Sequence, residues 1–157
     1  MSQQIDVLVV DDRAADAEVT VFALKRAAPQ ANTLWLNSGD LALQFLLGTG
    51  PRSRHRRMPS LILLSQNMKR LSGPALLDLI RCHPTTSGLR VVLVRRGDEA
   101  APKSVAPRFE PDAYMRRSSD PDEFCEQMEA LVSRWLENAE NTRVETFARQ
   151  PLRDCNL

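Results

Sequence analysis

The 157-residue chain has few of the residues that mark secreted, metal-binding or membrane proteins. It has three cysteines and no C-x-x-C spacing, so neither a disulfide framework nor a zinc knuckle is expected. Its longest apolar runs are far too short to span a bilayer, and the N-terminus lacks the basic region of a signal peptide. These absences predict a cytoplasmic protein that has no membrane segment.

An excess of charge of one sign is also missing. The chain has 21 basic and 20 acidic residues, which gives a formal net charge of +1, so broad electrostatic binding of nucleic acid is not expected. A local basic cluster lies in residues 48–58 and contains Arg52, Arg54, Arg56 and Arg57. We interpret this cluster as a solvated loop, and contact with an acidic partner or nucleic acid is the alternative.

Short apolar runs that are rich in β-branched residues indicate strands that are covered on both faces, as in a parallel sheet. Three such runs are clear, and two weaker candidates accompany them: Ile5–Val10, Leu61–Leu64 and Val91–Val94, then Thr33–Leu36 and Ala113–Met115. Helical patterns fill the intervals between them. The alternation predicts an α/β fold, a doubly wound five-stranded parallel sheet in a single domain.

The helical patterns differ in strength. After Asp12, the spacing of Val19, Phe22, Ala23 and Arg26 predicts the buried stripe of a first helix. A second helix begins after Ser38, with Ala42, Phe45 and Leu46 as its apolar residues, and a third covers about residues 74–81. Residues 98–111 contain three prolines, so any helix there is expected to be short, broken or displaced.

The last helix carries the clearest signals. Asp120 is a candidate N-cap, Pro121 suits the first helical position, and Glu123 is placed to reciprocate the cap. One apolar stripe follows, formed by Phe124, Met128, Leu131, Val132 and Trp135. Residues 139–157 are polar and lack periodicity, so we interpret them as a C-terminal tail or dimerisation arm after a domain that covers residues 4–138.

In a doubly wound sheet the functional site lies outside the carboxyl ends of the strands. Asp11 and Asp12 follow the first strand and could help to hold a hard cation through oxygen ligands. Ser65 and Asn67 follow the third strand. The fourth strand ends at Arg95, and the fifth supplies Tyr114 and Arg117, the last residues of the predicted site.

The segments VLVVDD, LILLSQNMKRLSG, VVLVRRG and DAYMRRSSDPDEF, in this order, resemble the receiver domain of bacterial response regulators over about residues 4–138. Within that family the chain is similar to the single-domain regulators associated with bacteriophytochrome histidine kinases. The resemblance implies a flavodoxin-like fold and a role in the phosphorelay of a two-component system. It also implies a histidine kinase partner and a homodimer. The dimer would form through the fourth helix, fifth strand and fifth helix, or through the C-terminal arm.

In the family a histidine kinase phosphorylates an aspartate at the end of the third strand, and Mg²⁺ binds beside it. The resemblance assigns Asp11 and Asp12 to the acidic pair, Asn67 to the carbonyl ligand and Tyr114 to the switch aromatic. The phosphoacceptor position, however, is occupied by Ser65. The Thr/Ser and Lys positions that bind the phosphoryl group are occupied by Arg95 and Arg117.

A serine hydroxyl is a weak nucleophile unless a neighbouring base activates it, and neither histidine of the chain, His55 or His83, follows a predicted strand. Ser65 also removes a carboxylate ligand, so Mg²⁺ binding should be weak or absent and no metal or other cofactor is expected. Two adjacent carboxylates without a cation repel each other. We therefore predict that Arg95 and Arg117 pair with Asp11 and Asp12 and lock one conformation, and the alternative is that both arginines point into solvent.

The sequence thus predicts an atypical single-domain response regulator, a pseudo-receiver that is not an enzyme, is not phosphorylated in the ordinary way and acts by binding other proteins. The alternative is a functional phosphorelay receiver with a non-standard acceptor.

Overall fold

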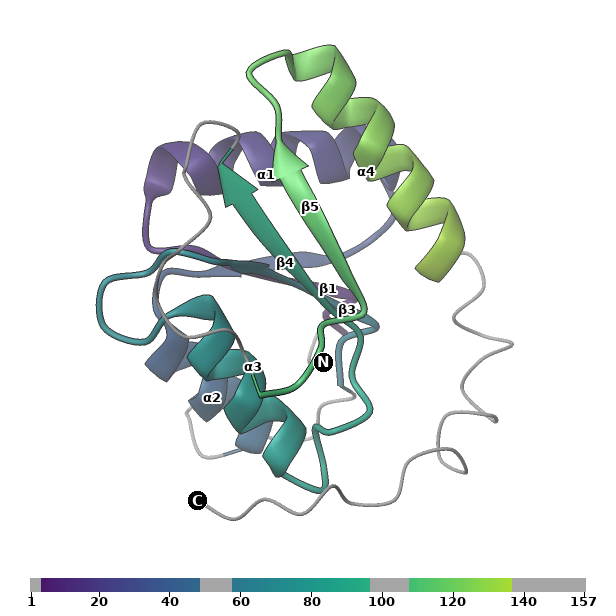
Figure 1. Ribbon diagram of the computed structural model, residues 1–157. Coiled ribbons are helices and arrows are strands. Elements are labelled where there is room, and N and C mark those ends of the chain that lie inside the picture. The colour runs from purple at the N-terminus through teal and green to yellow at the C-terminus, as the bar shows by residue number, and fades with distance from the viewer. Residues whose placement is uncertain (1–3, 49–57, 97–107, 137–157) are drawn as a thin grey trace.

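The computed structural model describes residues 4–48, 58–96 and 108–136 (Figure 1). Within these ranges strands and helices alternate, apart from the interval between the last two strands. The elements are β1 (Val7–Val10), α1 (Ala14–Ala27), β2 (Thr33–Leu36), α2 (Gly39–Leu47), β3 (Leu61–Ser65), α3 (Gly73–Cys82), β4 (Val91–Arg96), β5 (Ala113–Arg117) and α4 (Pro121–Trp135). All five predicted strands are present.

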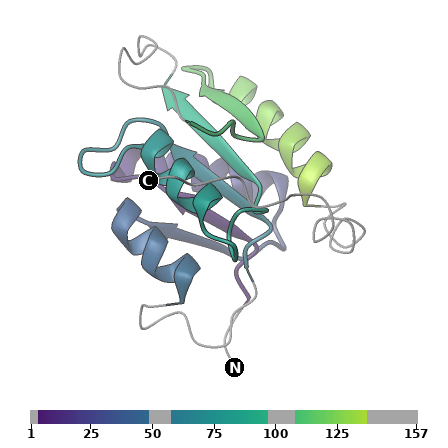
Figure 2. The same cartoon turned by 60° about the horizontal axis from the view of Figure 1, so that its bottom comes forward.

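The strands form one parallel sheet in the order β2-β1-β3-β4-β5, which confirms the predicted doubly wound fold. Helices α1 and α4 cover one face, and α2 and α3 cover the other (Figures 1 and 2). Strands β1 and β3 lie in the middle of the sheet, and their apolar side chains are buried against both helical layers. No helix in the described ranges is both long enough and apolar enough to cross a bilayer.

Polar side chains cap the helices as the sequence predicts at two of the starts. The Ser38 hydroxyl accepts a hydrogen bond from the backbone N–H of Leu41 at 3.1 Å, and the Asp120 carboxylate accepts one from Asp122 at 3.0 Å. The predicted reciprocal bond from Glu123 to the cap is wrong. Glu123 instead accepts a hydrogen bond from the Ser118 hydroxyl at 2.7 Å, which in turn accepts from the Asp120 N–H.

The predicted buried stripe of α1 is right at Ala23 and wrong at its other three residues, which are exposed. Val19 and Phe22 are 43% and 59% exposed, and the residues that face the interior are Ala17, Thr20, Ala23 and Leu24. The helix is therefore rotated relative to the orientation that its largest apolar side chains favour. Its inner face includes the buried Thr20, whose hydroxyl accepts a hydrogen bond from Arg117 of β5.

The stripe of α4 follows the prediction closely, because Phe124, Met128, Val132 and Trp135 are buried and Leu131 packs against them. The basic loop predicted at 48–58 lies outside the described residues except at its two ends, and the C-terminal tail at 139–157 lies wholly outside them. The fourth helix expected within 98–111 lies outside them as well, except for residues 108–111, which are not helical. The boundary between the domain and the tail stays a prediction for the same reason.

The turn between β3 and α3 brings two backbones unusually close. A Cβ atom at Gly73 would collide with the carbonyl oxygen of Ser65, so only glycine fits this position without a shift. The Gly73 N–H also donates to the carbonyl oxygen of Gln66 at 3.1 Å. This contact fixes the segment that carries Ser65 at the carboxyl edge of the sheet.

Candidate functional site

The candidate site lies at the carboxyl edge of the sheet, where β1, β3, β4 and β5 end. The register pairs Val10 of β1 with Leu64 of β3. Asp11, the residue after β1, therefore lies level with Ser65, the last residue of β3. The register also pairs Arg96 with Arg117 at the ends of β4 and β5. The topology therefore gathers the acidic pair, the serine and the arginines at one edge, as the strand order predicts.

The two adjacent acids face different surroundings. Asp11 is 2% exposed, and its Oδ1 accepts a hydrogen bond from the backbone N–H of Arg13 at 3.0 Å. Its carbonyl oxygen accepts a hydrogen bond from the indole Nε1 of Trp35 at 2.8 Å. Asp12 is only half-buried, and its Oδ2 accepts a hydrogen bond from the backbone N–H of Lys69 at 2.8 Å. Asp12 therefore ties the end of β1 to the loop after β3.

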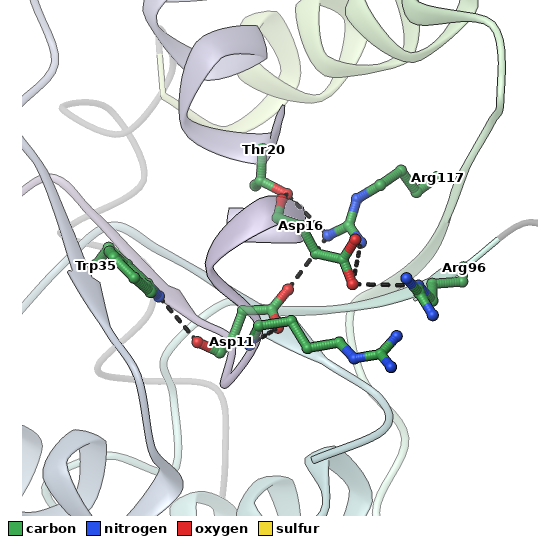
Figure 3. Close-up of polar contacts among 7 residues, drawn as sticks. Asp11, Asp16, Thr20, Trp35, Arg96 and Arg117 are labelled. Carbon is green, nitrogen blue, oxygen red and sulfur yellow. Dashed lines mark hydrogen bonds and ion pairs between the residues drawn. The ribbon is translucent and has the colours of Figure 1, made fainter. Parts of the chain in front are cut away.

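Arg117 lies between the end of β1 and the first half of α1 (Figure 3). Its side chain is 10% exposed, and its Nη2 is 3.4 Å from Oδ2 of Asp11. The same nitrogen donates to the Thr20 hydroxyl at 2.9 Å, and Nη1 is 3.5 Å from Oδ2 of Asp16. One buried guanidinium thus contacts two carboxylates and one hydroxyl. The hydrogen bond to this guanidinium explains why Thr20 faces the interior.

A second arginine extends this network. Nε of Arg96 lies 3.1 Å from Oδ2 of Asp16, so Asp16 contacts both guanidinium groups (Figure 3). The side chain of Arg96 is 40% exposed, four times as much as that of Arg117. We define the Arg117 cluster as Asp11, Asp16, Thr20, Arg96 and Arg117.

The predicted pairing is therefore corrected in two respects. Arg117 does contact Asp11, but the second arginine is Arg96 rather than Arg95, and the second acid is Asp16 rather than Asp12. The reason is strand alternation, because Arg96 shares the α1 and α4 side of the sheet with Val92 and Val94. Arg95 points to the opposite side of the sheet.

Tyr114, the predicted switch aromatic, lies on that opposite side as well. It is 60% exposed and stands next to Leu93 in the register. Burial of part of the ring raises the pKa of its hydroxyl, and the Glu110 carboxylate adds to the rise. Tyr114 is therefore neutral near pH 7 and is separated from the Arg117 cluster by the sheet.

Ser65 is half-buried at the end of β3. Its hydroxyl forms no hydrogen bond with any residue in the described ranges, so no described group is placed to take its proton. His83, one of the two histidines of the chain, follows α3 and contacts the Thr85 hydroxyl through Nδ1 at 2.8 Å. His55 lies outside the described residues.

The residues present do not suit a hard cation. Mg²⁺ prefers several oxygen ligands, usually with one or two carboxylates. Here the carboxylate of Asp11 contacts a backbone N–H and the Arg117 guanidinium, and a guanidinium beside a carboxylate repels a metal ion. Ser65 and Asn67 supply no further carboxylate, and no group of three metal-ligating side chains occurs in the described part of the chain.

Burial raises the pKa of the Asp11 carboxyl above its ordinary value of 3.8. The nearby Asp16 carboxylate adds to the rise, whereas the Arg13 N–H and the Arg117 guanidinium lower the pKa but do not cancel the effect of burial. The folded protein therefore holds the Asp11 proton more tightly than the unfolded chain does. The Asp11 contribution to the free energy of unfolding is greatest below pH 3.8 and is lost as the pH rises through the folded-state pKa.

This shift predicts a pH dependence that an Asp11→Asn variant reveals, because an amide does not titrate. As the pH rises from below 3.8, the free energy of unfolding of the wild type should fall relative to that of D11N. Urea denaturation of both proteins over a series of pH values measures this difference. If the free energy of unfolding of the wild type instead rises relative to that of D11N, then Arg117 affects the pKa of Asp11 more than burial does.

Three members of the Arg117 cluster, Asp16, Thr20 and Arg96, are absent from the site that the sequence predicts, and so is the supporting Trp35. One signal for two of them is visible in the sequence, since Asp16 and Thr20 are four residues apart and share one face of a helix. Nothing in the sequence marks Trp35 as a donor to the Asp11 carbonyl.

No family model matches the chain, and no curated protein matches its sequence. Solved structures do match. The phosphorylated cyanobacterial phytochrome response regulator RcpA is 20% identical with a TM-score of 0.71, and the match covers 87% of this chain and 96% of that one. The Mn²⁺-bound form of response regulator Rcp1 is 21% identical with a TM-score of 0.68, covering 86% and 96%.

A response regulator in red light signalling of R. palustris is 23% identical with a TM-score of 0.69, and the match covers 83% of this chain and 92% of that one. At these identities the likeness concerns the fold. The structural neighbours of this chain are thus receiver domains of response regulators, some of them from phytochrome systems, and the chain has the receiver, or flavodoxin-like, fold.

Proposed function

We propose that this protein is an atypical single-domain response regulator that works in the cytoplasm by binding other proteins, without ordinary phosphorylation. The observation that carries the proposal is the position of the Arg117 guanidinium, 3.4 Å from the buried Asp11 carboxylate. A cation already pairs with the acid that a receiver uses to hold Mg²⁺. The hydroxyl of Ser65 replaces the carboxylate that would accept the phosphoryl group.

The same contacts support a single, fixed conformation. Arg117 on β5 is bonded to residues at the end of β1 and on α1, so it links three elements around the carboxyl edge. An ion pair of this kind is insulated from solvent and is weakly screened by salt. The protein would therefore present a constant surface to its partner, as an adaptor or as a competitor of a working receiver.

The partner class in this proposal is a histidine kinase, and its support is the likeness to a phytochrome response regulator and to a response regulator in red light signalling. The test uses an autophosphorylated phytochrome-type histidine kinase that carries labelled phosphate. We expect the chain to bind the dimerisation domain of the kinase while the label stays on the kinase. Label that moves to this chain would contradict the proposal and would favour a functional relay with a non-standard acceptor.

A further inference from the structure

Strand β2 forms one edge of the sheet and pairs, among the described strands, with β1 alone. The carbonyl oxygens of Asn32 and Leu36 accept hydrogen bonds from β1, from the N–H groups of Asp6 at 2.8 Å and Asp11 at 3.2 Å. Because backbone groups alternate in direction along a strand, those of the odd-numbered Thr33 and Trp35 point away from β1. The outer edge of β2 therefore offers donors and acceptors that fit another strand.

This edge lacks the features that usually prevent such pairing. Native edge strands are protected by charged side chains, by proline or by bulges. The chain has no charged residue from Ala27 to Gly39, and β2 itself has the sequence TLWL. The opposite edge is different, because β5 carries the exposed Arg116 and follows Pro111. Only one of the two edges is therefore protected in the usual way.

The edge strand itself carries an exposed aromatic side chain, because Trp35 is 38% exposed. The indole N–H of Trp35 is bonded to the Asp11 carbonyl, which fixes the ring. Among the described residues, the edge thus combines backbone groups that pair with no other strand with an aromatic ring that a hydrogen bond holds in place.

From these observations we infer that β2 pairs with β2 of a second copy of this chain. A twofold axis perpendicular to the sheet reverses the strand direction, so the two strands are antiparallel and the helical layers stay on the same sides. A second copy fits this edge better than a charged partner does. The uncharged edge offers no electrostatic attraction to a charged partner, whereas two uncharged edges approach each other without repulsion. The inference does not depend on the proposed function.

Light scattering after size-exclusion chromatography tests the pairing on the full chain. The wild type should elute at twice the 17.7 kDa mass of one chain. Thr33→Lys should elute at the mass of one chain, because it places a charge on the neutral outer edge of each copy. The matched control is Tyr114→Lys on the opposite edge strand, which should stay dimeric. A wild type at the mass of one chain, or a T33K variant that stays dimeric, would overturn the inference.

Hydrogen exchange of the wild type provides a test that needs no variant. The outward amides of Thr33 and Trp35 should exchange more slowly as the protein concentration rises. On β5 the Asp112 N–H donates to the Val91 carbonyl of β4, so the outward amides there are those of Ala113 and Met115, and their exchange should not change. Concentration-dependent protection on β5 with none on β2 would place the contact at the other edge and overturn the inference.

Discussion

Replacing Arg117 with methionine should lower the free energy of unfolding at neutral pH by about 3–5 kcal/mol, the usual cost of removing one partner of a buried ion pair. The Asp11 side chain is 3% exposed and the Asp16 side chain 15% exposed, so neither carboxylate can recover full hydration when the guanidinium is removed. Thr20 would lose a partner as well. Methionine keeps much of the volume, so packing should contribute little to the loss.

The matched control is Arg96→Met. The Arg96 side chain is 40% exposed and contacts Asp16 alone in the described part of the chain, so the loss should be at most about 1 kcal/mol. Urea denaturation compares the three proteins, and a series of pH values adds a second comparison. The deficit of R117M should shrink as the pH falls through the folded-state pKa of Asp11, because protonated Asp11 no longer needs a counter-ion. Equal losses in both variants would show that Arg117 has no special role.

Changing Ser65 to aspartate should not by itself produce a working receiver. The variant restores the missing carboxylate, but the Arg117 guanidinium still lies 3.4 Å from Asp11 and opposes a metal ion there. We expect S65D to gain no phosphoryl group from acetyl phosphate and Mg²⁺. The double variant S65D/R117K replaces the forked guanidinium with a compact ammonium and should gain one.

Intact mass spectrometry measures both variants, and hydroxylamine treatment identifies an acyl phosphate. Arg95→Lys in the S65D background is the matched control, because Arg95 lies on the other side of the sheet from the Arg117 cluster and should leave the result unchanged. Efficient Mg²⁺-dependent phosphorylation of S65D alone would contradict the blocking role of Arg117. Failure of the double variant would contradict it as well.

The strands could be predicted from the sequence because a strand that is buried on both faces is apolar at every position. In the runs around Val7 and Leu61, apolar residues do not alternate with polar ones, which is typical of a strand between two helical layers. The structure shows that these residues are buried. The edge at which the site lies also follows from the strand order. These features depend on burial and topology, which act on whole segments rather than on single side chains.

The details of the Arg117 cluster could not be predicted, because they depend on contacts between distant elements. The sequence favours Val19 and Phe22 as the inner face of α1, since they are the larger apolar residues. Instead, Asp16 and Thr20 turn inward because a buried guanidinium from β5 needs partners on that side. The choice between Arg95 and Arg96 likewise depends on which face each residue of β4 occupies.

The most direct measurement of the central claim is the intact mass of the wild-type protein after incubation with acetyl phosphate and Mg²⁺. We predict an unchanged mass of 17.7 kDa, because no described residue is placed to activate Ser65 and Arg117 pairs with the acid that would hold the metal ion. A chain that gains the mass of one phosphoryl group, whether as an ester at Ser65 or as an acyl phosphate on an acid of the site, would contradict it.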